Sequence, residues 1–232
     1  MIEILRELDF RPLYISVKTA ILATIIVFFL GVFLANVITK TSKRSKMLWD
    51  SILTLPMVLP PTVIGFFLLI LFSLRRPFGD FLYTTYHIKV VQTWAGCVIA
   101  AVVVSFPLMY RSARGAFEQV NPNVLYAAQT IGMKNRAIFW KVLMTEARPG
   151  IVAGGVLTFA RALGEYGATS MLAGNIEGKT GTIAQVIAMV MKDGDYLKAW
   201  VWAGIMMLFA FAILTAMNLF GDHQKRIPRR TK

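Results

Sequence analysis

The sequence predicts an all-α, polytopic integral membrane protein in which residues 1–232 form a single transmembrane domain. Hydrophobic residues make up 56% of the chain and charged residues only 16%, a balance too apolar for a soluble domain of this length. A helix needs roughly 20 mostly apolar residues to cross a bilayer. Uncharged runs of that length occur at 19–39, 51–74, 90–110 and 199–221.

Five membrane spans are expected in chain order. With the residues that flank the apolar runs, they cover about 13–39, 50–74, 90–110, 149–172 and 199–221. The span at 149–172 is apolar through residue 163 except for Arg161, and it continues past Gly164. Residues 180–191 are also uncharged but make only about half a span, so we expect a short re-entrant or interfacial helix there.

Basic residues at the ends of these runs predict the orientation of the chain. Segments 39–46 and 111–148 and the tail after Gly221 are rich in Lys and Arg, which favour the cytoplasmic side. The other connections balance acidic and basic residues and are expected outside. Five spans, with the N-terminus outside and the C-terminus inside, place every basic segment in the cytoplasm and every balanced connection outside. Because membrane topology explains the net charge of +13, nucleic acid is not expected as a partner.

Aromatic residues near the expected span ends are interpreted as anchors in the headgroup layer, where amphipathic rings are favoured. They are Trp49, Trp94, Tyr110, Trp200 and Trp202. The single cysteine, Cys97, lies in an apolar run and is expected to be a small packed side chain rather than a redox or metal-binding group.

The connection 111–148 is too long for a simple turn and is expected to be a docking element. Residues 121–123 (Asn-Pro-Asn) predict a helix start, because Asn can cap a helix and proline tolerates the first turn. Gly132 should end this helix, and a second helix is expected over 133–142. A helix lying flat on the membrane is the alternative. The apolar side chains at helical spacing are Val124, Leu125, Ala128 and Ile131.

This loop resembles the cytoplasmic loop of permease subunits of binding-protein-dependent, ATP-driven importers. That family carries Glu-Ala-Ala, three residues, Gly, nine residues and then Ile-x-Leu-Pro. Ala127, Ala128 and Gly132 match at this spacing. Tyr126 replaces the acid, and residues 144–145 (Met-Thr) replace Leu-Pro. The resemblance implies a type I importer permease fold with a coupling helix that enters a cleft of a separate ATPase. The coupling residues would be Asn123, Leu125, Tyr126, Ala127, Ala128, Ile131 and Gly132.

Two further segments narrow the resemblance. Residues 55–65, with their Leu-Pro-x-x-Leu-Pro-Pro pattern, are similar to a segment of molybdate permeases. Residues 161–168 resemble a signature shared by molybdate, tungstate and sulfate permeases, and the likeness continues through 174–182. The resemblance implies that the chain translocates molybdate by alternating access. Tungstate and sulfate remain alternatives.

Several polar or helix-breaking residues are candidates for the translocation path or its gate. The prolines of segment 56–61 break the helix, which a membrane tolerates only where protein or water pairs the freed carbonyls. Arg161 and Glu165 share a helical face, and each is costly in hydrocarbon unless it is paired or faces a wet cavity. A structural ion pair, and hydroxyls bonded to their own helix, are the alternatives. The candidates are Pro60, Pro61, Thr62, Ser105, Thr158, Arg161, Glu165, Gly167 and Thr169.

Glycines around the same span are expected to permit close helix approach or bending. They are Gly150, Gly154, Gly155, Gly164 and Gly167.

No catalytic or metal site is expected in this chain. Segment 174–180 superficially resembles a phosphate-binding loop, but three residues separate its glycines where that loop has four, and it follows a membrane helix rather than a strand. His87 and His223 are isolated and are placed on opposite sides of the membrane. The chain is therefore expected to be a translocation subunit without a cofactor of its own. ATP and magnesium would be bound by the partner ATPase.

The resemblance also implies the assembly in which the chain works. Its partners in the cell membrane would be a second copy of itself, a pair of ATPase subunits, an extracytoplasmic molybdate-binding protein and membrane lipid. Two other classes of function remain open. One is a non-transport membrane assembly protein whose loop binds another partner, and the other is an intramembrane enzyme centred on Arg161 and Glu165.

Overall fold

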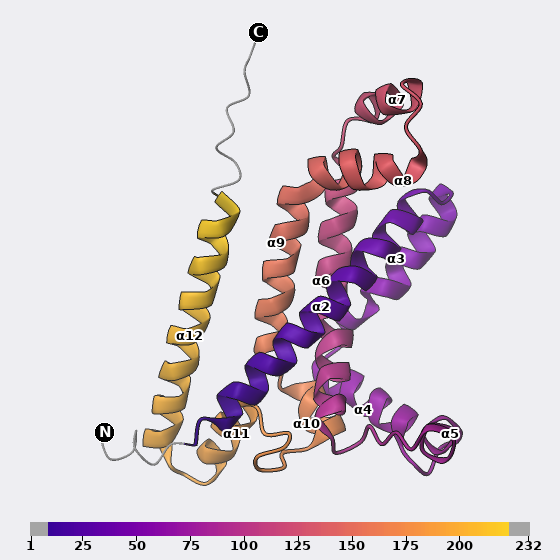
Figure 1. The fold of residues 1–232 in the computed structure, drawn as a ribbon. Helices are drawn as coiled ribbons and strands as arrows, with labels where there is room; N and C mark the ends of the chain where they lie inside the picture. Colours follow the sequence, from indigo (N-terminus) through magenta and orange to yellow (C-terminus); the bar gives the residue numbers. More distant parts are fainter. Residues whose placement is uncertain (1–8, 223–232) are drawn as a thin grey trace.

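The computed structural model describes residues 9–222, and within them every regular element is a helix (Figure 1). The basic tail and His223 lie outside the described residues. The helices are α2 (Arg11–Thr39), α3 (Lys43–Val58), α4 (Pro61–Phe72), α5 (Pro77–Tyr86), α6 (Trp94–Glu118), α7 (Pro122–Thr130), α8 (Asn135–Ile138), a π-helical segment (Phe139–Leu143), α9 (Met144–Leu163), α10 (Gly167–Ala173), α11 (Ile183–Lys192) and α12 (Tyr196–Asp222).

Among residues 9–222, three continuous helices are long and apolar enough to cross a membrane: Arg11–Thr39, Trp94–Glu118 and the Tyr196–Met217 part of α12. Helices α3 and α4 pass the same test together, but they are bent by 106° at the break between them. These elements correspond to four of the expected spans. The long helices run between two ends of the molecule, with α7 and α8 at one end and α5 and α11 at the other (Figure 1).

The break between α3 and α4 has a local cause. A residue that precedes proline is pushed out of the helical region into extended conformations. Leu59 precedes Pro60, and Pro60 precedes Pro61, so both Leu59 and Pro60 are extended, with ψ of 141° and 136°. Pro61 then begins α4, where its missing N–H leaves no intrahelical bond unmade. The predicted helix break is confirmed at Pro60 and Pro61, but the prediction was wrong for Pro56, which lies inside α3.

The span expected at 149–172 is divided between two helices in the structure. Helix α9 begins five residues earlier, at Met144, and ends at Leu163, and α10 is a separate helix. Helix α9 carries Glu146, Arg148 and Arg161, and it is not among the helices that satisfy the length and apolarity criteria for a span. The uncharged segment 180–191 does contain a short apolar helix, α11, as predicted.

Helix α5 was not predicted, because its residues show no long apolar run. It begins at Pro77 and ends at Tyr86, and the next residue, His87, adopts a left-handed conformation with φ of 54°. Gly79 lets α5 fold against the end of α4, since a Cβ there would lie 2.2 Å from the Ser73 carbonyl oxygen.

The centre of the fold is the packing of α2, α6 and α9. Small residues bring these helices together, as expected for membrane proteins. A Cβ on Gly150 would lie 2.7 Å from Ala116 Cβ, and one on Gly154 would lie 2.5 Å from Ser112 Cβ. A Cβ on Gly155, in contrast, would meet nothing within 4 Å, so Gly155 makes no close helix contact within residues 9–222, and its predicted role in packing or bending stays a prediction. The main buried cluster contains Val27, Val32, Ala35, Met109, Tyr110, Ala113, Leu143 and Ile151, among others.

Candidate coupling surface and translocation elements

The helix α7 forms as its sequence predicts. The Asn121 side-chain oxygen accepts a hydrogen bond from the Asn123 backbone N–H at 2.9 Å, and Pro122 occupies the first helical position. At the other end, Gly132 takes a left-handed conformation with φ of 78°, and the Met133 N–H donates to the Ala128 carbonyl at 3.1 Å. Both ends of α7 are therefore set by local sequence.

The seven predicted coupling residues divide into anchors and exposed groups. Ala128 is buried, and Leu125 is half-buried against the main apolar cluster, so these two hold α7 on the body of the protein. Tyr126 is 61% exposed and Ile131 is 77% exposed. Asn123, Ala127 and Gly132 are exposed as well. Helix α7 lies at one end of the molecule (Figure 1). Its two large exposed apolar side chains, Tyr126 and Ile131, are of the kind found at contacts with another protein.

The second predicted helix, over 133–142, is shorter than expected. Helix α8 ends at Ile138, and a π-helical segment, Phe139–Leu143, joins it directly to α9. Phe139 packs edge-on against Phe117 of α6, with ring centroids 6.2 Å apart. The loop is thus continuous with α9 through a wider helical turn of the kind often found at functional positions.

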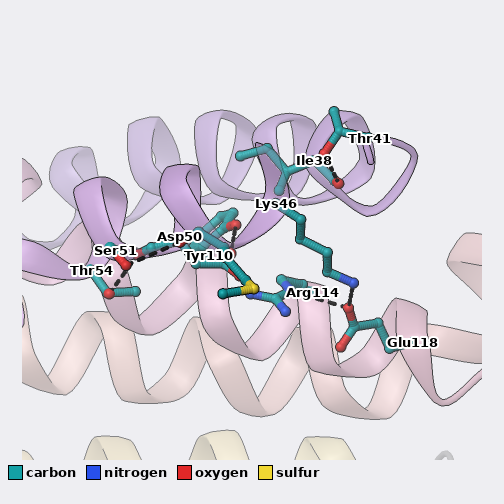
Figure 2. A network of polar contacts seen from close by, with 10 residues as sticks. Ile38, Thr41, Lys46, Asp50, Ser51, Thr54, Tyr110, Arg114 and Glu118 are labelled. Carbon is teal, nitrogen blue, oxygen red and sulfur yellow. Dashed lines mark hydrogen bonds and ion pairs between the residues drawn. The ribbon is translucent and has the colours of Figure 1, made fainter. Parts of the chain in front are cut away.

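Beside the loop, a network of five polar side chains ties α3 to α6 (Figure 2). Arg114 forms an ion pair with Asp50, and its Nε lies 3.2 Å from Glu118 Oε1. Lys46 forms an ion pair with the same Glu118 oxygen, and the Tyr110 hydroxyl donates to Asp50. Sequence reasoning missed this network. The available signal was that each helix presents its members four residues apart, on one face.

Two of the aromatic residues predicted as headgroup anchors are instead packed inside the chain. Tyr110 is fully buried, and its ring stacks on Phe106 with an interplanar angle of 13°. Trp202 is 4% exposed and packs edge-on against Phe10. The interpretation of these two as lipid-facing anchors is wrong, because each ring has protein partners. Trp49 and Trp200 are exposed.

At the turn between α9 and α10, Arg161 and Glu165 form the predicted pair. Arg161 Nη1 lies 2.8 Å from Glu165 Oε2, and the Glu165 side chain is only 2% exposed. The other carboxylate oxygen, Oε1, accepts a hydrogen bond from the Ala168 backbone N–H at 2.7 Å. Glu165 therefore closes the first turn of α10 and separates it from α9. This arrangement agrees with the alternative interpretation from the sequence, in which Arg161 and Glu165 form a structural ion pair.

The proline segment before α4 and the turn between α9 and α10 lie against each other. Helix α10 packs on α4, and Gly65 of α4 lies so close to it that a Cβ would be 2.7 Å from Ala168 Cα. Similarly, a Cβ on Gly167 would lie 3.0 Å from Pro61 Cβ and 3.1 Å from the Thr62 nitrogen. The structure thus brings together the proline segment before α4 and the Glu165 turn, which lie about a hundred residues apart in the chain.

The sequence matches a known protein family over most of its length. Residues 19–227 match the family described as "Binding-protein-dependent transport system inner membrane component". The chain belongs to this family. It is therefore a permease component of a transport system in the cytoplasmic membrane, and the membrane prediction is confirmed.

Individual relatives agree with this assignment. The permease is 39% identical over 180 residues to the molybdenum transport system permease protein ModB of Escherichia coli (strain K12), covering 78% of this chain and 79% of ModB. It is 32% identical over 216 residues to the sulfate transport system permease protein CysT of Salmonella typhimurium, covering 93% and 76% of the two chains. Among solved structures, the inward-facing MetNI methionine ABC transporter superposes with a TM-score of 0.71 at 14% identity, over 92% of this chain and 94% of that one. This likeness confirms the predicted permease fold.

Four hydroxyl residues of the permease were predicted to line its path. Thr62 is exposed at the start of α4, and Ser105, Thr158 and Thr169 are buried in the single chain. Ser105 Oγ donates to the Ala101 carbonyl at 2.6 Å, and Thr158 Oγ1 donates to the Gly154 carbonyl at 2.7 Å. Thr169 is 1% exposed on α10. For Ser105 and Thr158 the bonds are those of the alternative interpretation, in which a hydroxyl pairs with its own helix. Their role in a path stays a prediction.

Proposed function

We propose that this permease is the molybdate-translocating subunit of an ATP-driven importer. The observation that carries the proposal is the coupling helix α7, whose capped start, buried Ala128 and left-handed Gly132 form a docking element on a chain that resembles ModB over most of its length. Tungstate has the same charge and geometry and is the nearest alternative. No bond is made or broken in this chain, since ATP and magnesium belong to the partner ATPase.

The proposed topology has five spans, with the N-terminus outside and the C-terminus inside. The three continuous apolar helices, the bent pair α3–α4, and α9 with α10 would be the spans. The basic segments 39–46 and 111–148 support the orientation, because the turn between α2 and α3 lies at the same end of the bundle as α7 and α8 (Figure 1). That end would face the cytoplasm.

The proposed mechanism is alternating access driven by the ATPase pair. Helix α7 would enter a cleft of the ATPase with Tyr126 and Ile131 as apolar contacts. Its movement would pass to α6, which precedes it directly, and from α6 to α3 through the Asp50–Arg114 network. Helix α3 leads into the proline break, and α4 packs on α10. Two copies of the permease would enclose the path, and a molybdate-binding protein would deliver the ion from outside. In the proposal, ATP binding shifts the population between two rigid-body arrangements.

The substrate is tested by measuring cellular molybdenum, tungsten and sulfur by elemental mass spectrometry in a strain lacking the gene, grown at scarce molybdate. Loss of molybdenum that returns with the intact gene supports the proposal. A chromosomal copy carrying Glu165→Ala disrupts the turn between α9 and α10. If its membrane level equals that of the wild type, a loss of cellular molybdenum in this variant comes from the altered turn and not from absence of the permease. Unchanged levels of all three elements would overturn the oxyanion assignment.

Sulfate is a second candidate, favoured by the match to CysT over 93% of this chain. In the same experiment, this candidate predicts loss of cellular sulfur and normal molybdenum. The non-transport alternative predicts no change in either element and no ATPase stimulation by the permease.

A further inference from the structure

A basic, aromatic cavity lies at the end of the permease opposite α7. Its volume is about 340 Å³, which falls within the range of roughly 300–1,000 Å³ found for small-molecule sites. The first two turns of α2, the start of α6 and the loop before α11 line this open cavity. The lining residues are Arg11, Tyr14, Ile15, Lys18, Trp94, Gly178 and Lys179.

Three of these seven residues are cations, and none is an acid. Within residues 9–222, Lys18 and Lys179 form no ion pair, whereas Arg11 Nε lies 3.7 Å from Asp9 Oδ1. That pair is largely exposed and therefore weak. Glu177 lines a neighbouring cavity of about 470 Å³ together with Asp9 and Lys198. Two acids of this end, Asp9 and Glu177, thus line the neighbouring cavity, whereas the lining of the basic cavity contains three cations and no acid.

The aromatic residues hold one of the cations in place. Lys18 Nζ lies 4.0 Å from the centre of the Trp94 ring and 5.9 Å from that of Tyr14. The Trp94 Nε1–H donates to Thr19 Oγ1 at 2.9 Å, which fixes the indole. An ammonium group positioned over a ring still has N–H donors free for an anion.

The loop beside the cavity depends on a glycine conformation. Gly178 has φ of 69°, a region that residues with a Cβ rarely adopt, so a larger side chain would strain the loop. A Cβ there would lie 3.4 Å from Arg11 Nη1, an ordinary contact distance, so the loop lies directly beside the guanidinium group. Lys179, the next residue, also lines the cavity.

We propose that this cavity binds a tetrahedral oxyanion group, supplied by the phosphate of an anionic phospholipid or by an oxyanion dissolved outside the membrane. Such a group offers only acceptors to the three cations. Lys18 is the last charged residue before the apolar run that begins at Thr19, and the Trp and Tyr rings are typical of the headgroup layer, so the cavity opens at lipid-phosphate depth. The placement rests on the proposed topology, but the site does not depend on which ion the permease transports.

The lipid source is tested with the purified full-length permease and phosphatidylglycerol. Native mass spectrometry counts the lipids retained by the wild type, by Lys18→Gln/Lys179→Gln, and by a matched control, Arg75→Gln/Arg76→Gln, which removes two exposed cations from the turn between α4 and α5. We expect the cavity variant to retain the lipid about ten-fold more weakly, because two charge-assisted contacts are lost, and the control to match the wild type. Lys18→Arg/Lys179→Arg should restore retention.

The dissolved source is tested by equilibrium dialysis of the lipid-free permease against orthophosphate and against molybdate. If only the cavity variant loses oxyanion binding while lipid retention is unchanged, the site takes a dissolved oxyanion. Equal retention of all probes by the cavity variant and the control would overturn the proposal. Unfolding midpoints of the variants in detergent establish that they are folded. Cellular molybdenum is a separate readout, so failure of the molybdate assignment leaves the lipid and phosphate results interpretable.

Discussion

Arg114 of α6 and Asp50 of α3 form an ion pair at the centre of the only polar network that links these two helices in the described part of the chain (Figure 2). Asp50 also accepts a hydrogen bond from the buried Tyr110 hydroxyl, and Arg114 also contacts Glu118. The pair lies where α6 approaches the coupling loop and where α3 begins its course toward the proline break. It is positioned to make the two helices move together.

Removing one partner of this pair should weaken both stability and coupling. We expect Asp50→Asn to lower the free energy of unfolding by about 1–3 kcal/mol, because the partly buried Arg114 loses one of its two charged partners and the Tyr110 hydroxyl loses a charged acceptor. Thermal unfolding of the detergent-solubilised permease measures this. Tyr110→Phe, which removes only the hydroxyl, should cost about 1 kcal/mol. A double-mutant cycle of Asp50→Asn and Arg114→Gln that shows additive effects would contradict a direct interaction.

Two adjacent glycines in α9 provide a matched test of the helix packing. A Cβ on Gly154 would lie 2.5 Å from Ser112 Cβ, whereas a Cβ on Gly155 meets nothing within 4 Å. We expect Gly154→Ala to destabilise the permease by about 1–3 kcal/mol through overpacking. Gly155→Ala should be neutral, or stabilising by up to about 1 kcal/mol, since alanine is the better helix former. Unfolding midpoints of the two variants that shift equally would contradict this packing of α9 on α6.

Local sequence predicted the parts of the molecule that have local causes. Asn121, Pro122 and Gly132 define α7 through capping and backbone preference. The bend after α3 follows from consecutive X–Pro bonds, and Arg161 pairs with Glu165 one turn along the chain. In each case, the residues that determine the geometry lie within a few positions of it.

The features that were missed leave no trace in the apolar periodicity, either because their partners are distant in sequence or because a single contact decides them. Tyr110 looked like a headgroup anchor because its bond to Asp50, sixty positions away, cannot be inferred from periodicity. The separation of α10 from α9 depends on a single local contact, in which the buried Glu165 carboxylate accepts a hydrogen bond from the Ala168 N–H three residues further on. Helix α5 has no apolar period to reveal it, and it forms against the end of α4 because Gly79 permits the contact. Tertiary context decides such elements.

The turn between α9 and α10 predicts an asymmetric response to mutation. Arg161→Ala leaves the buried Glu165 carboxylate without its cation, which we expect to cost about 3–5 kcal/mol. Adding Glu165→Gln should recover much of this loss, since the neutral amide oxygen can still accept from Ala168. Membrane level and unfolding midpoint measure the effect. A double variant less stable than Arg161→Ala would contradict the assignment of Arg161 as the partner of this charge.

The exposed face of α7 allows coupling to be tested without disturbing the fold. Ile131 is 77% exposed, so Ile131→Asp should leave the unfolding midpoint within a few tenths of a kcal/mol of the wild type, as for most surface substitutions. At the proposed ATPase contact, however, it buries a carboxylate against an apolar cleft. We expect this to weaken docking by at least ~2 kcal/mol, about thirty-fold in affinity. Proteoliposomes with the cognate ATPase should lose permease-stimulated ATP hydrolysis.

Ile88→Asp is the control, because Ile88 is an exposed isoleucine beside α5, at the opposite end of the molecule. Equal ATPase stimulation in both variants would show that α7 does not dock through this face.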